Sequence, residues 1–171
     1  MPTSGSMRNM AQQSAEAQYV TLGLGAEVFA VPVAYVREIL DYRAPFNIPD
    51  GPSYLLGLID VRGSGTPVID LRTKLGLPRS PLGPATRILV LDVPLENRVL
   101  SLGLVADRVI EVIVIANSAI APAPDVGTPW RSDYIEGVLR RDDGFVVLFN
   151  LARLLTASDV SLLSSSMEQA A

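Results

Sequence analysis

Two aspartates and an arginine are the residues of this chain that come closest to a reactive cluster. Asp60, Arg62 and Asp70 lie within two apolar segments that are joined by a Gly-Ser-Gly turn. Each aspartate follows an apolar residue, as in aspartic proteases, but neither precedes the Thr-Gly or Ser-Gly typical of such sites. Asp70 is better interpreted as the N-cap of a short helix, and Asp60 as an exposed strand residue. A small-molecule-binding or enzymatic β-barrel with an Asp60/Asp70/Arg62 cluster remains the alternative hypothesis.

The composition excludes much of the common catalytic and metal chemistry. The 171 residues include no histidine and no cysteine, which excludes Ser-His-Asp, Cys-His and HExxH sites as well as thiolate zinc sites. The sequence also contains no P-loop, no dinucleotide-binding fingerprint and no EF-hand spacing. Carboxylates and lysine could still support an enzyme, but much of the catalytic repertoire is missing, and we predict no cofactor and no bound metal.

Arg62 and Glu38 are polar residues in otherwise apolar surroundings. Arg62 ends an apolar segment immediately before Gly63, at the rim of a predicted hairpin. Arginine is favoured at interfaces, because its planar guanidinium makes paired hydrogen bonds while its stem covers apolar surface. Glu38 stands among apolar residues that include Val36 and Ile39. On pattern alone, a solvated surface side chain is the simpler interpretation of both residues.

The sequence predicts that short β-strands position Asp60, Asp70, Arg62 and Glu38. The apolar segments predict strands over residues 19–24, 28–33, 86–93 and 99–105, and hairpins over 54–70 and 134–149. Residues 34–40 fit either a strand extension or a short helical turn, and residues 107–115 fit extended or irregular chain. Short helices are predicted after the N-caps Asp70 and Asn150. Asp142, Asp143 and Gly144 form the predicted turn of the second hairpin.

The two hairpins belong to two similar halves of the chain. At an offset of 80 residues, the matched positions are Tyr54 with Tyr134, Gly57 with Gly137 and Asp70 with Asn150. At an offset of 73, residues 36–40 match residues 109–113. Alternation alone makes any two apolar hairpins similar, but it does not explain a common register of tyrosine, glycine and helix-cap positions. The repeat predicts two small barrels of about five strands each, with one short helix per half.

Composition and charge also indicate where the domain lies in the chain and which classes of partner are disfavoured. We predict flexible tails over residues 1–18 and 156–171 and one domain over 19–155, with barrels over roughly 19–78 and 86–155. A chain that is 49% hydrophobic and 19% charged is typical of a folded protein, and a net charge of −4 disfavours nucleic acid and anionic membrane surfaces. No signal peptide and no apolar segment of roughly 18 residues is present, so we expect a cytoplasmic protein without membrane insertion.

An ordered series of motifs resembles the CheW-like family of chemotaxis coupling proteins. The resemblance covers about residues 19–155. Its strongest pieces are residues 19–22 (Tyr-Val-Thr-Leu), 29–32 (Phe-Ala-Val-Pro), 36–39 (Val-Arg-Glu-Ile), 57–63 (Gly-Leu-Ile-Asp-Val-Arg-Gly), 67–72 (Pro-Val-Ile-Asp-Leu-Arg), 105–109 (Val-Ala-Asp-Arg-Val) and 134–138 (Tyr-Ile-Glu-Gly-Val). Each piece is weak by itself, whereas their order is highly specific.

The resemblance implies an all-β fold of two intertwined SH3-like five-stranded barrels with short capping helices. It also implies a non-enzymatic adaptor that joins the regulatory domain of a CheA-type histidine kinase to the cytoplasmic tip of methyl-accepting chemoreceptors. The receptor would lie in the groove between the subdomains, where the Arg62 position is important for coupling. The predicted partner-binding residues are Arg62, Glu38, Val36, Val33, Ile39, Gly57 and Gly63.

Three features depart from the usual family pattern. Asp60 stands where the family usually has asparagine, Ser64-Gly65 replaces a bulky β-branched residue after the turn glycine, and Arg140-Arg141 is an uncommon basic pair. These departures concern the identity of the partners, so an accessory chemosensory pathway is as consistent with the sequence as a flagellar one. Gly57 has a counterpart in the second hairpin, Gly137, so we expect it to serve the fold. Arg62 has no such counterpart, since Asp142 stands at the matching position, and we therefore expect Arg62 to serve function.

Overall fold

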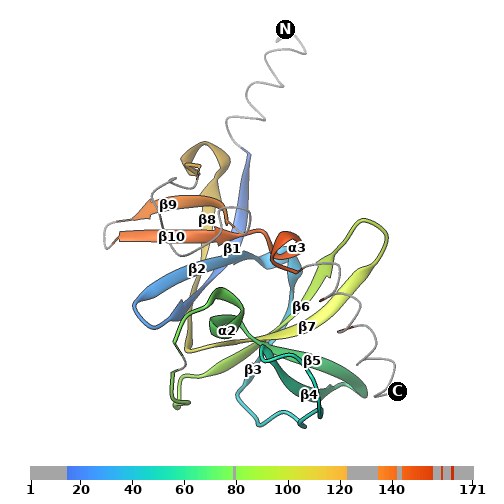
Figure 1. The fold of residues 1–171 in the computed structure, drawn as a ribbon. Coiled ribbons are helices and arrows are strands. Elements are labelled where there is room, and N and C mark those ends of the chain that lie inside the picture. The colour runs from blue at the N-terminus through green and yellow to red at the C-terminus, as the bar shows by residue number, and fades with distance from the viewer. Residues whose placement is uncertain are drawn as a thin grey trace, which may run out of the picture.

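The computed structural model describes residues 15–78, 80–122, 135–141 and 144–155, together with Asp159 and Leu163. The predicted all-β fold is confirmed: these residues form two five-stranded sheets with a few short helical segments. In chain order the elements are β1 (Glu16–Leu24), β2 (Glu27–Pro32), η1 (Val33–Tyr35), β3 (Val36–Asp41), β4 (Leu55–Val61), β5 (Ser64–Asp70), α2 (Leu71–Leu75), β6 (Arg87–Pro94), β7 (Val99–Ala106), β8 (Arg108–Ala116), η2 (Asn117–Ala119), β9 (Ile135–Arg141), β10 (Gly144–Phe149) and α3 (Leu151–Leu154) (Figure 1).

Each sheet combines strands from both halves of the chain. Barrel A has the strand order β8-β1-β2-β10-β9, and barrel B has the order β3-β6-β7-β5-β4. Exchanging β1–β5 one for one with β6–β10 converts either order into the other, which confirms the repeat seen in the sequence. The predicted division at residues 19–78 and 86–155 therefore separates the two repeats but not the two barrels. Because β3 pairs with β6 and β5 pairs with β7, the first repeat contributes the hairpin β4–β5 and strand β3 to a barrel that it shares with the second repeat, so the barrels are intertwined.

The repeat extends to details of strand pairing. In each hairpin the register shifts by one residue beside the matched glycine, between Leu55 and Gly57 and between Leu148 and Phe149. A side chain at Gly57 would place its Cβ 2.1 Å from the Phe46 carbonyl oxygen, and one at Gly137 would place it 2.8 Å from the Ala121 carbonyl oxygen. The matched glycines are thus needed for the close approach of a chain segment that closes each barrel.

One large apolar cluster lies between the barrels and holds them together. It contains residues of both sheets and of both short helices, among them Leu22, Phe29, Leu71, Leu75, Leu89, Leu102, Phe149, Leu151 and Leu154. Two smaller clusters fill the interiors of barrel A and barrel B. Burying one such aliphatic or aromatic side chain contributes roughly 1.5–3 kcal/mol, so this shared cluster is a major source of stability.

Several local predictions are confirmed and two open ones are resolved. Asp70 accepts a hydrogen bond from the Arg72 amide at 3.1 Å, and Asn150 accepts one from the Arg153 amide at 3.2 Å, as N-caps do. Residues 33–41 contain both predicted alternatives, since the helical turn η1 is followed by strand β3. Residues 107–115, left between extended and irregular, lie largely in strand β8. Tyr134 and the turn residues Asp142 and Asp143 lie outside the described residues.

The predicted tails are shorter than the sequence suggested. Strand β1 begins at Glu16 rather than near Tyr19, because β8 continues to Ala116 and offers pairing partners to these polar residues. At the other end, Asp159 and Leu163 are helical and buried, although they follow the predicted end of the domain. Leu163 belongs to the shared apolar cluster, and Asp159 bonds to Tyr54 and Lys74, although the surrounding sequence is rich in serine.

Candidate functional site

The hairpin between β4 and β5 ends in a two-residue turn. Val61 pairs with Ser64, which leaves Arg62 and Gly63 as the turn residues, with φ angles of 53° and 86°. Positive φ at both central positions is the pattern of a type I′ turn, which prefers Asn-Gly. Asp60 supports the turn, since its Oδ1 accepts a hydrogen bond from the Gly63 amide at 2.8 Å. An aspartate at this position therefore supplies the same acceptor that an asparagine would.

Arg62 and Glu38, singled out separately in the sequence, form an ion pair. The Arg62 Nε donates to Glu38 Oε2 at 3.0 Å. Glu38 lies on β3 and Arg62 follows β4, so the pair joins the two edge strands of barrel B. The Arg62 side chain is 79% exposed and the Glu38 side chain 22% exposed. The pair therefore presents a guanidinium at the rim of barrel B while the glutamate lies mostly below the surface.

The predicted apolar contact residues Val36 and Ile39 lie on the opposite face of β3 from Glu38, and Val33 lies in η1 just before this strand. Ile39 pairs with Leu89 of the shared core, whereas Glu38 pairs with Val90 of the barrel B interior. Ile39 is 42% exposed, while Val33 and Val36 are half-buried and pack against the shared core. The structure thus divides the predicted set into a rim and an inter-barrel face, which meet along β3.

The two glycines of the predicted site have different places. Gly63 is exposed in the turn beside Arg62, and a Cβ there would meet nothing within 4 Å. Gly57 is buried and lies against Phe46, with a φ of 144°. Its burial and this close approach indicate an architectural role for Gly57, while its place among the predicted partner-binding residues stays a prediction. Gly57 shapes the hairpin that carries Arg62.

The alternative Asp60/Asp70/Arg62 cluster does not assemble. Asp60 pairs with Gly65, and Asp70 lies five residues further along β5, which places the two aspartates roughly 17 Å apart. Each carboxylate is engaged locally: Asp60 with the turn, and Asp70 with the Arg72 amide and the Thr73 hydroxyl. These geometries correct the alternative and give no support to a catalytic site at this hairpin.

Two further observations concern metal-ligand clusters and pockets in the described part of the chain. Residues 15–78, 80–122, 135–141 and 144–155, with Asp159 and Leu163, contain no group of three or more His, Cys, Asp or Glu residues that could hold a metal ion. A pocket of about 750 Å³ opens in barrel A, lined largely by apolar residues with Glu27, Glu111, Arg140 and Arg141. It is remote from the aspartates of the hairpin, which belong to barrel B.

Among the residues that the structure describes, no helix is long and apolar enough to cross a membrane.

The rim of barrel A repeats the ion pair of barrel B. Glu111 matches Glu38 at the offset of 73, and its Oε1 lies 3.5 Å from a terminal nitrogen of Arg141. Arg141 ends β9, as Arg62 follows β4. Val112, which matches Ile39, is 58% exposed. The repeat relates only the two glutamates, because Arg141 corresponds to Val61 and not to Arg62 at the offset of 80. The strand orders show that each pair nevertheless joins the two edge strands of one barrel.

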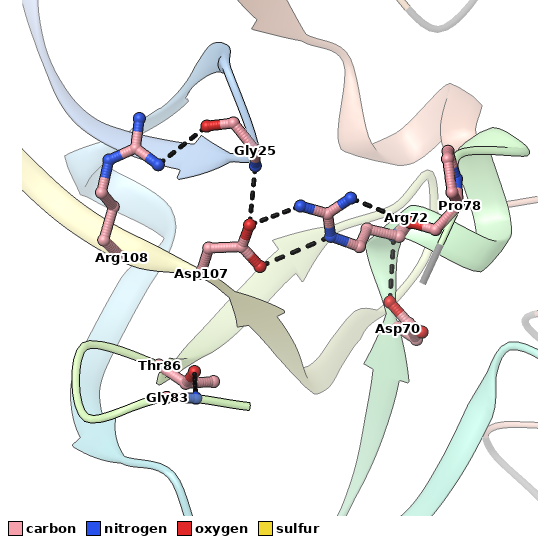
Figure 2. A network of polar contacts seen from close by, with 8 residues as sticks. All are labelled: Gly25, Asp70, Arg72, Pro78, Gly83, Thr86, Asp107 and Arg108. Carbon is pink, nitrogen blue, oxygen red and sulfur yellow. Dashed lines mark hydrogen bonds and ion pairs between the residues drawn. The ribbon is translucent and has the colours of Figure 1, made fainter. Parts of the chain in front are cut away.

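A second polar network lies where the chain crosses from barrel B to barrel A (Figure 2). Asp107 is the only residue between β7 and β8. Its carboxylate accepts hydrogen bonds from the Gly25 amide at 2.6 Å and from Arg72, whose Nε lies 3.4 Å from Oδ1 and whose Nη2 bonds Oδ2. Burial acts to raise the pKa of Asp107, but the bonds from Arg72 and Gly25 and the charges of Arg72 and Arg108 hold that pKa below its usual value.

A third network ties the C-terminal segment to barrel B. Asp159 accepts a hydrogen bond from the Tyr54 hydroxyl and forms an ion pair with Lys74, the only lysine in the sequence. The Lys74 ammonium also lies 4.5 Å from the centroid of the Tyr54 ring. Burial and the neighbouring Asp159 raise the pKa of Tyr54, which keeps its hydroxyl protonated as the donor. No local pattern in the sequence indicates that Tyr54, Lys74 and Asp159 contact one another.

Comparison with known proteins agrees with this architecture. Residues 18–159 match the family model of the CheW-like domain. A probable chemotaxis protein CheW of Rhizobium etli is 27% identical over 83% of the chain and 89% of its own length. The protein FrzA of Myxococcus xanthus is 28% identical over 85% of the chain and 89% of its own length. The crystal structure of the scaffolding protein TtCheW from Thermoanaerobacter tengcongensis superposes with a TM-score of 0.75 at 28% identity, covering 85% of this chain and 91% of that one.

Proposed function

The chain belongs to the CheW-like domain family, and from this premise we propose that it is a non-enzymatic adaptor that couples chemoreceptors to a CheA-type histidine kinase. Its partners are the cytoplasmic tip of methyl-accepting chemoreceptors and the regulatory domain of the kinase. It acts in the cytoplasm and is recruited to receptor arrays at the inner membrane. The similarity to both a chemotaxis CheW and FrzA makes an accessory pathway as suitable a setting as a flagellar one.

The conformation of Arg62 is the observation that carries this proposal. A non-glycine residue with positive φ is uncommon, and a long side chain there strains the backbone by roughly 1 kcal/mol. The turn type would accommodate asparagine or glycine better. Arg62 nevertheless occupies it with a side chain that is 79% exposed and bonded only to Glu38 among the described residues. Arg62 therefore costs the fold stability, while its exposed guanidinium is available to bind a partner.

The predicted contact set is best understood as one surface along β3. Arg62, Gly63 and Glu38 supply a polar rim, and Ile39 supplies an exposed aliphatic side chain on the adjoining inter-barrel face. An apolar centre with a polar border is the usual composition of a protein interface. Val33 and Val36 support this surface from below, since both pack against the shared core.

Two barrels allow two partners to be held at once. Exposed large apolar side chains occur on both barrels: Ile39 and Phe46 belong to the barrel B side, and Ile110, Val112, Val114 and Phe145 to barrel A. A receptor bound along β3 would leave the surface of barrel A accessible to the kinase domain. The adaptor then acts thermodynamically, because a receptor state that binds it differently shifts the equilibrium of the kinase that it holds.

A charge reversal at Arg62 tests this assignment in a reconstituted mixture of receptor fragment, kinase and adaptor. We expect Arg62→Asp to leave the fold intact and to abolish most receptor-dependent control of kinase autophosphorylation. The physical reason is that aspartate would face Glu38 and remove the positive charge that the rim offers. Autophosphorylation rate with and without the receptor fragment is the measurement.

Arg98→Asp is the matched control, since Arg98 is an exposed arginine in the turn between β6 and β7 of the same barrel. This variant should retain normal control of the kinase. Normal control by a folded Arg62→Asp protein, or equal loss in both variants, would contradict the assignment of the β3 rim.

A further inference from the structure

The short helix α2 departs from the repeat in one respect. At the offset of 80 residues, Arg72 and Lys74 of α2 correspond to Ala152 and Leu154 of α3. The second repeat thus has no charged side chain where the first has two cations. Because the strands and caps of the two repeats agree, this difference marks a role that only one of the repeats has.

Arg72 bonds to the crossover between the barrels. The chain leaves barrel B at Ala106 and enters barrel A at Arg108, so Asp107 alone connects β7 to β8. The Asp107 amide donates to the Gly23 carbonyl of β1 at 3.0 Å. Its carboxylate accepts from the Gly25 amide in the β1–β2 turn of barrel A and from Arg72, which follows β5 of barrel B (Figure 2). One carboxylate therefore bonds to both barrels.

Neighbouring contacts hold this network in place. The Arg72 Nη1 donates to the Pro78 carbonyl at 2.9 Å, and the Arg108 Nη1 donates to the Gly25 carbonyl at 2.9 Å. Arg108 also covers Gly23, where a Cβ would lie 2.3 Å from the guanidinium carbon. The ends of α2, of the β1–β2 turn and of β8 are thus fixed to one another around Asp107.

We propose that the Arg72–Asp107–Gly25 network fixes the orientation of barrel A relative to barrel B, and that this orientation sets the coupling between partners bound to the two barrels. Arg72 and Asp107 are positioning residues, since neither forms part of the β3 surface. The first half of the proposal concerns the chain alone. The second half rests on the adaptor function proposed above.

The physical argument compares the two ways in which the barrels are joined. The shared apolar cluster holds the barrels at a set distance, but apolar contacts are non-directional and tolerate small rotations. Charge-assisted hydrogen bonds are directional and about twice as strong as neutral ones. The Arg72 side chain is 12% exposed and the Asp107 side chain 27% exposed, so water and salt screen this pair less than a surface pair. The network can therefore fix an angle that the core leaves loose.

Spin labels on the isolated chain test the orientation role. The sequence has no cysteine, so single cysteines can be placed at Arg98 in barrel B and at Glu136 in barrel A, both exposed. Asp107→Asn, which keeps the shape but removes the charge, should broaden or shift the inter-label distance distribution measured by pulsed electron spin resonance. The matched control is Asp41→Asn, which removes an ion pair with Arg87 inside barrel B and should leave the distribution unchanged. Circular dichroism checks folding, and Arg72→Gln carries the same test if Asp107→Asn does not fold.

Partner binding tests the coupling role. The coupling factor is the ratio of receptor-fragment affinities measured with and without the kinase regulatory domain, and typical factors lie between about 5 and 150. Asp107→Asn should bring this factor close to 1 while each partner alone binds within about twofold of wild type; a fall in both separate affinities would contradict a positioning role.

The outcomes separate the two claims. A distance distribution in folded Asp107→Asn that equals that of wild type overturns the orientation role. An unchanged coupling factor together with a changed distribution overturns the coupling role. If the wild-type chain binds neither partner, the adaptor function is wrong and the coupling role falls with it, while the spin-label distances still decide the orientation role.

Discussion

At the scale of single residues, Arg62 combines an unfavourable backbone conformation with an exposed side chain. Its ion pair with Glu38 offers little compensation, because pairs with such an exposed partner contribute at most about 1 kcal/mol. The apolar surroundings of Arg62 and Glu38 drew attention to each residue separately, and only the family resemblance predicted that both contact a partner. It could not predict that they pair, since they lie on strands that meet only when barrel B closes.

Replacing Arg62 should reveal the backbone strain directly. In a Glu38→Gln background, which already lacks the ion pair, Arg62→Asn is expected to raise the free energy of unfolding by about 0.5–1 kcal/mol, because asparagine tolerates positive φ better than arginine. Urea denaturation measures the change. A loss of stability in this background would show that Arg62 serves the fold, which is contrary to its proposed role.

At the scale of elements, the hairpins and their caps were predictable and the exchange of strands was not. Helix caps, turns and strands depend on neighbouring residues, so Asp70, Asn150 and Gly57 could be placed from the sequence. The pairing of β3 with β6 and of β5 with β7 depends on long-range contacts that leave no local pattern. The same reason explains why the sequence did not reveal the Asp107 and Asp159 networks. The exposed apolar residues of β8 alternate at 110, 112 and 114, a signal that was available.

The matched glycines of the two hairpins should respond alike to substitution. Gly57→Ala and Gly137→Ala are each expected to lower the free energy of unfolding by more than about 2 kcal/mol, since each Cβ would collide with the chain that closes its barrel. Gly63→Ala is the control, because it has positive φ but no neighbour within 4 Å, and it should lose only about 1 kcal/mol. Equal effects at Gly57 and Gly63 would show that the close approach of Phe46 has little importance.

At the scale of the whole molecule, the crossover should make stability depend on pH. The pKa of Asp107 is lower in the folded chain than its ordinary value of about 3.9, so its ionised form stabilises the fold. This contribution is complete above the unfolded pKa and is lost as the pH falls through the folded pKa. We expect the difference in unfolding free energy between wild type and Asp107→Asn to shrink as the pH falls below about 4. Urea titrations from pH 6 to pH 2 measure it, and a constant difference would exclude a role for the Asp107 charge.

The most direct test of the central claim is whether the chain holds both partners in one complex. A tagged wild-type chain is mixed with the receptor cytoplasmic fragment and the kinase regulatory domain. Size-exclusion chromatography with light scattering then measures the molar mass of each species that elutes. The adaptor function predicts a single species that contains all three proteins, and a mixture without the chain in which receptor fragment and kinase domain elute separately. Elution of the chain with neither partner, or with only one of them at a time, would contradict it.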